Sequence, residues 1–140
     1  MEKIFRSKCA ITSALDIIWD KWTILIIRDM VAKHKKTFTE LSESDEKIAT
    51  NILSCRLKLL EKYKIITKEK SPENKKTNIY KLTDKGLGFT AILLELTFWS
   101  IDHIKEFQPN MAVSKAEEFR KDKAWSIKCI IESYKKSVLE

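Results

Sequence analysis

Hydrophobic residues recur at helical spacing through the first half of the chain. Apolar side chains repeat every three or four positions over residues 11–20, and they crowd together over residues 21–32. The first pattern predicts an amphipathic helix, and the second predicts a central helix that is buried on most sides. A short helix is expected over 37–44, and a fourth over roughly 49–62. The stripe of the first helix consists of Ile11, Leu15, Ile18 and Trp19.

Short polar residues that favour the first position of a helix precede three of these segments. In one case a glutamate follows three residues later, which makes a capping box of two reciprocal hydrogen bonds. The expected caps are Thr12 or Ser13 for the first helix, Thr37 with Glu40 for the third, and Thr50 or Asp45 for the fourth.

The fourth helix divides into an apolar arc and a polar arc when its residues are placed at about 100° intervals. The apolar arc consists of Ile48, Ala49, Ile52, Leu53, Leu57, Leu59 and Leu60. The polar arc consists of Thr50, Asn51, Ser54, Lys58, Glu61 and Lys62. Arg56 falls inside the apolar arc, where a guanidinium requires a carboxylate partner. We therefore expect Arg56 to be structural and to pair with Glu40 or Asp29.

The spacing changes from helical to alternating after the fourth helix. Residues 64–70 and 77–83 are short runs typical of strands, and residues 71–76 between them include Pro72 and Asn74. Because both of these residue types favour turns, the pattern predicts a two-stranded hairpin.

A long helix is expected after the hairpin, over residues 84–107, with Thr83 as its N-cap and Pro109 beyond its end. Its apolar residues occupy more than one face, and the rest of a chain of this size can hardly cover them all. A partner subunit is therefore expected to pack against this helix.

A final helix is expected to begin at a capping box formed by Ser114 and Glu117 and to run through Tyr134. One side of this helix carries large apolar residues that can pack against the rest of the protein. This stripe consists of Phe119, Trp125, Ile127, Ile130, Ile131 and Tyr134.

Composition and charge narrow the choice of partner. The chain has 140 residues, only two Gly and two Pro, and a net charge of +7 with a pI of about 9.3. Few turn residues favour long helices, and a basic protein suits a polyanionic partner. The charge is concentrated, because residues 56–81 contain nine Lys and Arg against three Glu, a net +6. This concentration favours a nucleic-acid-binding face over a basic surface that only keeps the protein soluble.

Several other classes of protein are disfavoured. The apolar run 89–101 is too short for a bilayer and includes Glu95, and residues 1–13 lack the apolar core of a signal peptide. A cytoplasmic protein without membrane contact is expected. His34 and His103 have no partner at metal-ligand spacing, and neither a glycine-rich phosphate loop nor a nucleophile elbow occurs. We therefore expect no enzyme, no metal and no cofactor.

The predicted order of elements is that of a winged helix-turn-helix, a mainly α protein (α+β) with a two-stranded wing and additional N- and C-terminal dimerisation helices. In this fold the helix over 49–62 lies in the major groove of double-stranded DNA, and the hairpin follows the backbone. Asn51 and Ser54 suit hydrogen bonds to base edges, whereas lysines suit phosphates. The expected DNA-binding residues are Thr50, Asn51, Ser54, Lys58, Lys68, Lys70, Lys75 and Lys76.

A set of motifs resembles one family of bacterial regulators. The motifs are "DKWTILIIRDM", "FTEL", "TNILSCRLKLLE", "YKLTDKG" and "FW", and they occur in this order between Cys9 and Trp99. The set is similar to that of the HxlR-type winged helix-turn-helix transcriptional regulators. The resemblance implies a cytosolic homodimer, held by its N-terminal and post-wing helices, that binds inverted-repeat operators. We place an HxlR-type domain with its dimerisation helices over 1–108, and a C-terminal helical extension over 109–140.

The sequence departs from this family's pattern at three places. Ala10 follows Cys9 where the family usually has proline, and Trp19 and Asp20 stand where glycines are common. Lys64 occupies the position of a glycine that usually leads into the first wing strand. A non-glycine residue in a left-handed conformation costs roughly 1 kcal/mol, so a different turn shape is expected to be favoured there.

Cys9 is the one candidate for chemistry, because the resemblance implies that some family members sense oxidants or electrophiles through a cysteine at this place. Arg6, Lys8 and the following helix N-terminus would stabilise its thiolate and raise its reactivity. The alternative is a small packing residue or an unreactive thiol. Cys55 and Cys129 are expected to be structural, and three widely spaced cysteines fit neither a disulfide framework nor a paired-cysteine metal site.

Two other functions use the same architecture. A MarR-like regulator that binds a small-molecule effector shares the fold but not the Lys-Trp helix that begins at Lys21 and Trp22. A winged-helix module that binds a protein would replace Asn51, Ser54 and Lys58 with apolar anchors. The sequence identifies neither an effector nor an operator.

Overall fold

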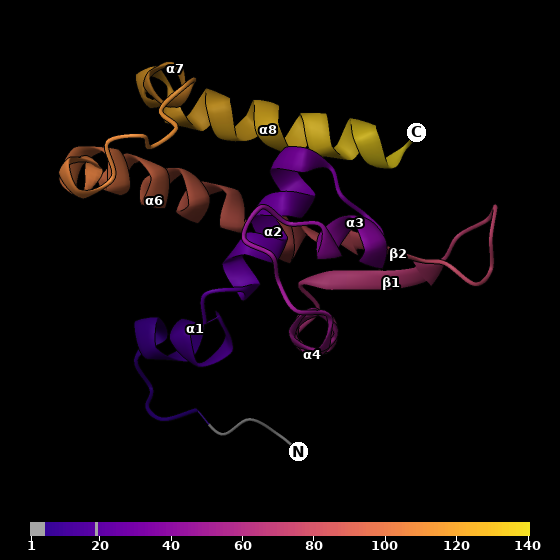
Figure 1. Cartoon of the computed structure of the whole chain (residues 1–140). Coiled ribbons are helices and arrows are strands. Elements are labelled where there is room, and N and C mark those ends of the chain that lie inside the picture. The colour runs from indigo at the N-terminus through magenta and orange to yellow at the C-terminus, as the bar shows by residue number, and fades with distance from the viewer. Residues whose placement is uncertain (1–4, 19) are drawn as a thin grey trace.

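The computed structural model of the chain describes residues 5–18 and 20–140. Helices form the body of the molecule, and a two-stranded hairpin extends away from it (Figure 1). In chain order the elements are α1 (Ala10–Ile18), α2 (Thr23–Lys33), α3 (Phe38–Ser42), α4 (Thr50–Lys62), β1 (Ile66–Lys70), β2 (Asn78–Leu82), α5 (Asp84–Leu87), α6 (Phe89–His103), η1 (Lys105–Phe107), α7 (Ala116–Lys121) and α8 (Lys123–Val138). Trp19, expected in the stripe of the first helix, lies outside the described residues.

This arrangement confirms the mainly α winged helix-turn-helix predicted from the pattern. The four helices expected in the first half of the chain are present as α1 to α4, and the hairpin follows α4 directly. The core forms where the apolar faces of these elements meet, because each helix buries one side. Its fully buried members include Ile27 and Met30 of α2, Leu41 of α3, Leu53 and Leu60 of α4, and Ile66 of β1.

Capping chemistry was predicted for α3 and for α1, with different outcomes. The hydroxyl of Thr37 accepts the backbone N–H of Glu40 at 3.1 Å, which confirms the N-cap of α3. The expected cap of the first helix is wrong, because α1 begins at Ala10, ahead of Thr12 and Ser13. Once the chain is already helical, a hydroxyl at these two positions cannot serve the first turn.

Helix α4 has no side-chain cap, so the cap expected from Thr50 or Asp45 is wrong. Thr50 is itself the first residue of the helix and follows Ala49. The carboxylate of Asp45 instead lies 2.9 Å from Nζ of Lys33 on α2. The first backbone N–H groups of α4 are therefore not occupied by a capping side chain.

The strands β1 and β2 pair in antiparallel register, with Ile66 opposite Leu82. Both strands lie within the ranges predicted for them. An isolated bridge between Thr37 and Ile79 attaches β2 to the segment that precedes α3. One edge of β2 is thus attached to the helical body, whereas the turn of the hairpin extends outward (Figure 1).

Lys64, in the turn between α4 and β1, has a backbone φ of 61°. This is the left-handed conformation that a glycine at the same position adopts freely. The expectation that the lysine would favour another turn shape is therefore wrong: the turn keeps a left-handed residue, at a cost of roughly 1 kcal/mol.

The helix expected over 84–107 is interrupted, which corrects that prediction. It divides into α5 and α6 at Gly88, and two closely spaced glycines, which are poor helix formers, account for the interruption. Thr83 caps α5 as expected, because its hydroxyl accepts the N–H of Gly86 at 3.2 Å. A side chain at Gly86 would overlap the carbonyl oxygen of Ile65, so α5 lies directly against the start of the wing.

Helix α6 has two apolar faces, as the sequence predicted. One face is buried in the protein, and the other is exposed. The buried face consists of Thr90, Leu94 and Phe98, and the exposed face of Ile92, Leu96 and Trp99. Neither α6 nor any other helix in the described ranges has the length and apolar character needed to cross a bilayer.

The C-terminal part forms two helices instead of the single one expected. Asp122 caps α8 by accepting the N–H of Trp125 at 3.0 Å. The capping box predicted at Ser114 and Glu117 is wrong, because α7 begins at Ala116 after Lys115 and has no side-chain cap. Helix α8 packs against α2 and α6, and Tyr134 lies in the core. Trp125, expected in the packing stripe of this helix, is instead 64% exposed.

Candidate nucleic-acid interface

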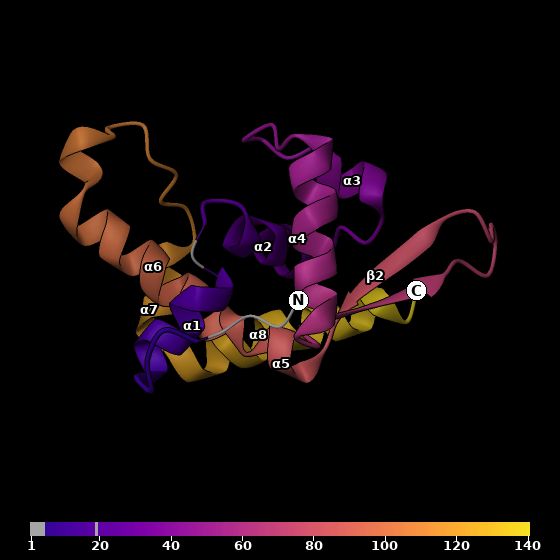
Figure 2. The same cartoon turned by 90° about the horizontal axis from the view of Figure 1, so that it is seen from below.

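The elements expected to contact DNA adjoin one another. Helix α4 packs against α3 and β1, and Figure 2 shows α4 beside α3 with the hairpin extending outward. Leu53, Leu57 and Leu60 anchor α4 in the core, since each has an exposed fraction of 2% or less. Because these residues recur at helical spacing, the opposite side of α4 remains at the surface.

The outer side of α4 carries the polar residues predicted for it. Thr50, Asn51 and Lys58 are exposed, and Ser54 is half-buried. Within the described residues, no side-chain hydrogen bond or ion pair engages these four side chains. Their donors and acceptors therefore remain available to a partner molecule.

The wing presents exposed lysines that have no carboxylate partner in the described chain. Lys68 and Lys70 lie on β1, and Lys75 and Lys76 lie in the turn between the strands. Alternate residues of a strand share a face, so Lys68 and Lys70 are directed to the same side of the hairpin. Lys81 on β2 differs, because it forms an ion pair with Glu69.

Ion pairs tie the turn before α4 to α2. Arg28 donates to both carboxylate oxygens of Glu46, at 2.9 and 2.7 Å, and to Asp29 at 3.0 and 2.7 Å. The hydrogen bonds from Arg28 lower the pKa of Glu46 to about 2, and those to Glu46 raise the pKa of Arg28. Lys33 likewise hydrogen-bonds Asp45 and lowers the pKa of that carboxyl. No sequence motif marks the pairs of Arg28 with Glu46 and of Lys33 with Asp45, because α3 and the connections on either side of it separate their members.

Arg56 pairs with a carboxylate, but both predicted partners are wrong. Its Nε lies 3.6 Å from Asp20, and not beside Glu40 or Asp29. Asp29 is already hydrogen-bonded by Arg28 on the same helix. The Asp20 carboxylate also accepts two backbone N–H groups at the start of α2, at 2.8 Å each. Asp20 thus links the start of α2 to α4.

Cys9 is exposed and immediately precedes α1. The backbone N–H of Thr12, its hydroxyl and the N–H of Ile11 lower the pKa of the Cys9 thiol, in that order of size. The direction agrees with the prediction, and the helix N-terminus is the cause. Arg6, expected to contribute, instead forms an ion pair with Asp16.

All three cysteines are free thiols. Cys129 on α8 is half-buried, whereas Cys55, expected to be structural, is exposed on α4. Cys55 lies one helical turn after Asn51, so it borders the polar side of the helix.

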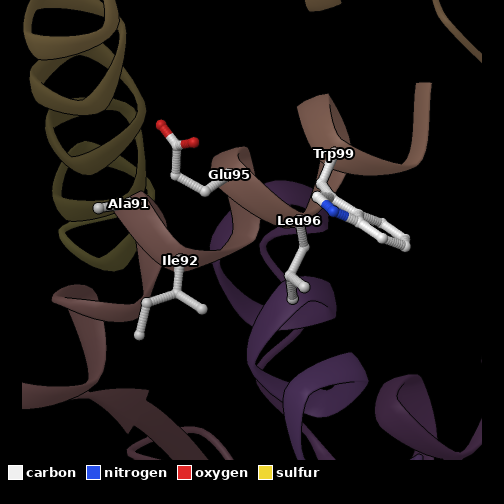
Figure 3. Close-up of a pocket in the computed structure, with 5 residues that line it drawn as sticks. All are labelled: Ala91, Ile92, Glu95, Leu96 and Trp99. Atoms are coloured by element: carbon white, nitrogen blue, oxygen red, sulfur yellow. The ribbon is translucent and has the colours of Figure 1, made fainter. Parts of the chain in front are cut away.

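An open apolar groove of about 460 Å³ runs along the exposed face of α6 (Figure 3). Figure 3 shows Ile92 and Leu96 extending from the same side of the helix. Ile92, Leu96 and Trp99 have exposed fractions of 44%, 50% and 55%. Large apolar side chains gathered at one surface are typical of a contact with another protein.

Comparison with known proteins identifies the family. A family model described as HxlR-like helix-turn-helix matches residues 17–108. The chain belongs to the HxlR-like family. It is therefore a helix-turn-helix, DNA-binding regulator of transcription, in agreement with the resemblance seen in the sequence.

Curated relatives and solved structures agree with this family. The HTH-type transcriptional regulator YodB of Bacillus subtilis (strain 168) is 33% identical over 88 residues, which are 63% of this chain and 78% of that protein. The reduced form of YodB has a TM-score of 0.57 at 28% identity, covering 71% of this chain and 98% of that one. The crystal structure of PA1607, a candidate transcription factor, has a TM-score of 0.66 at 29% identity, covering 76% and 72%. The relatives compared are regulators and not enzymes.

Proposed function

We propose that the protein is a cytoplasmic homodimer that binds an inverted-repeat operator in double-stranded DNA. Helix α4 of each protomer lies in the major groove of one half-site, and the wing lies along the neighbouring backbone. The observation that carries this proposal is the placement of unpaired lysines. They gather on α4 and the wing, and they are Lys58, Lys68, Lys70, Lys75 and Lys76.

On α4, base-edge contacts come from Asn51 and Ser54, with Thr50 at the start of the helix. Asn suits a bidentate hydrogen bond to adenine, and Ser is compatible with several base edges. The uncapped N-terminus of α4 adds backbone N–H groups, which favour a phosphate. The lysines hold the protein on the backbone without reading the sequence.

Dimerisation proceeds through the exposed face of α6 and through α1. Ile92, Leu96 and Trp99 supply the apolar surface, and Ile11 on α1 is 73% exposed. Both helices lie outside the three-helix unit of α2, α3 and α4, so a contact there leaves the DNA-binding side free. A twofold axis through this contact generates the two half-sites.

Cys9 gives the regulator a thiol response. Its lowered pKa increases the thiolate fraction, and its exposure admits an oxidant or an electrophile. The relative YodB has been crystallised in quinone-bound and diamide-treated forms, which supports such a response here. Modification of Cys9, at the start of α1, would act on the dimer contact proposed above.

DNA binding is tested by fluorescence anisotropy with a labelled duplex from the promoter beside the protein's own gene and a scrambled duplex of equal length. Tighter binding to the promoter duplex is expected, and both affinities should fall steeply with added KCl. Light scattering of the same sample measures the mass in solution. A monomer that binds neither duplex at low ionic strength would overturn the proposal.

A further inference from the structure

The C-terminal helix α8 reaches the base of the wing through one buried hydrogen bond. The backbone N–H of Leu82, the last residue of β2, donates to the hydroxyl of Tyr134 at 2.7 Å. Tyr134 is 4% exposed, and 52 residues separate it from Leu82. A buried backbone N–H left without an acceptor costs on the order of its full desolvation, so this bond stabilises the end of the strand.

The hydroxyl of Tyr134 takes the place of a strand carbonyl. One edge of β2 pairs with β1, and on the other edge the N–H of Tyr80 donates to the carbonyl oxygen of Lys36 at 2.7 Å. Residues 80 and 82 point their N–H groups to the same edge, because the strand repeats every two residues. Lys36 thus accepts the N–H of Tyr80, and the hydroxyl of Tyr134 accepts the next N–H of this edge, that of Leu82.

Packing holds Tyr134 firmly at this position. Ile130, Ile131 and Val138 of α8 pack against the main core, in which Tyr134 itself is buried. The ring of His34, at the end of α2, meets the ring of Tyr134 edge-on at 6.3 Å between centroids. Burial raises the pKa of Tyr134, so its phenol stays neutral at physiological pH. The acceptor is thus fixed by α8 and α2, both outside the hairpin.

We propose that Tyr134 is a positioning residue for DNA binding: it fixes the base of β2, and thereby the direction in which the wing lysines meet the DNA backbone. This inference rests on the proposed function, since it assumes that the wing contacts DNA. It also gives a role to α8, which lies beyond the residues 17–108 matched by the family model. A wing that moves more freely in the unbound protein must be ordered when it binds DNA, and the entropic cost of this ordering lowers the affinity.

Tyr134→Phe removes the acceptor and keeps the ring, so the core remains packed. Tyr63→Phe is the matched control, because Tyr63 also packs against the core and its hydroxyl makes no hydrogen bond with the described residues. Amide hydrogen exchange followed by NMR should show faster exchange at Leu82 in Tyr134→Phe only. The affinity for the promoter duplex should fall about threefold to tenfold in Tyr134→Phe and stay unchanged in Tyr63→Phe.

A double-mutant cycle separates an effect through the wing from a general loss of stability. In a Lys75→Ala/Lys76→Ala background two of the wing lysines no longer contact phosphates, so adding Tyr134→Phe should cost less affinity than it does in the wild-type protein. In an Asn51→Ala background the full loss should persist, because α4 does not depend on the wing for that contact. Equal losses in both backgrounds would show that Tyr134 does not act through the wing.

The remaining outcomes each decide the inference. Faster exchange at Leu82 with unchanged DNA affinity would make Tyr134 a purely structural residue and overturn the proposal. Unchanged exchange and affinity in Tyr134→Phe, with weaker binding by Lys75→Ala, would overturn it while the proposed function stands. Failure of the wild-type protein to bind any duplex would overturn the proposed function, and this inference with it.

Discussion

Arg28 holds the carboxylate of Glu46 in two hydrogen bonds of 2.9 and 2.7 Å, across 18 residues of sequence. Glu46 lies in the turn between α3 and α4, and Arg28 lies on the central helix α2. Arg28 also bonds Asp29, which is 1% exposed. The turn of the helix-turn-helix is thus attached to the buried helix by charge-assisted hydrogen bonds, which are stronger than neutral ones.

Loss of this pair should lower stability in a pH-dependent manner. The folded-state pKa of Glu46 is about 2, below its ordinary value of 4.5, so its contribution is complete above pH 4.5 and is lost as the pH falls toward 2. Glu46→Gln should reduce the free energy of unfolding by about 0.5–1 kcal/mol near neutral pH, a modest amount because the side chain is partly solvated. Urea unfolding measures the difference, which should shrink below pH 4.5.

Glu43→Gln provides the control for this change. Glu43 lies nearby and is exposed, and within the described ranges its carboxylate forms no ion pair. The same loss of one negative charge should leave the free energy of unfolding nearly unchanged. An equal effect from both variants would mean that net charge, and not the bond to Arg28, determines the result.

Two variants should distinguish a side chain that contacts the bases from one that contacts the DNA backbone. Asn51→Ala should weaken binding to the promoter duplex about tenfold and leave scrambled DNA nearly unaffected, because a bidentate base contact is lost. Lys75→Ala should weaken both alike and reduce the slope of log affinity against log salt by about 0.9. Lys128→Ala, an exposed lysine on α8, should change neither. Equal losses of affinity for both duplexes in Asn51→Ala would show that Asn51 does not contribute to sequence recognition.

A charge on the exposed face of α6 should convert the proposed dimer to a monomer. Leu96→Lys places an ammonium in the apolar groove, where it would be buried without a partner in the dimer. Light scattering should show half the mass, while circular dichroism stays unchanged because Leu96 is 50% exposed in the single chain. Ala124→Lys, at an exposed position of α8, adds the same charge and should remain dimeric.

Cys9→Ser should abolish the response of DNA binding to diamide and to quinones. The serine keeps the size of the side chain but cannot form a thiolate or a covalent adduct. Binding of the untreated protein should stay the same. Cys55→Ser and Cys129→Ser, measured beside it, should respond as the wild type does. An unchanged response in Cys9→Ser would show that the Cys9 thiol is not the sensor.

The contact between α5 and the wing should make Gly86 sensitive to substitution. Gly86→Ala places a methyl group against the carbonyl oxygen of Ile65, so the free energy of unfolding should fall by about 1–3 kcal/mol. Gly88→Ala is the comparison, because its added carbon would lie 3.2 Å from the carbonyl oxygen of Lys85. Its effect should be much smaller, and thermal unfolding compares the two.

Structural features that depend on neighbouring residues, such as the buried side of a helix and its N-cap, could be predicted from local patterns in the sequence. Placing the residues of α4 at about 100° intervals correctly separated Leu53 and Leu57, which are buried, from Asn51 and Lys58, which are exposed. Burial along an amphipathic helix follows the helical repeat of the sequence. The caps at Thr37 and Thr83 followed from hydroxyls next to the helix start. The cap predicted at Ser114 was wrong, because the helix that follows it, α7, begins after Lys115 and has no side-chain cap.

Relationships between distant segments could not be read from the sequence. The partner of Arg56 depends on where α2 begins relative to α4. The helical spacing of α4 could show only that Arg56 lies in the apolar arc and needs a carboxylate partner. The bond from Leu82 to Tyr134 depends on how α8 crosses the body of the protein. Both are set by packing between elements, for which a single sequence has no period or motif.

The division between paired and unpaired cations should affect how the regulator encounters DNA. Arg28 and Lys33 are paired with carboxylates, while within the described residues Lys58, Lys68, Lys70, Lys75 and Lys76 have no carboxylate partner. These unpaired lysines add positive potential to α4 and the wing, so on the proposed function the field of a duplex should turn this face toward the DNA before contact. Salt should slow this oriented capture more than it hastens release, so the ionic strength of the cell governs search time as well as occupancy.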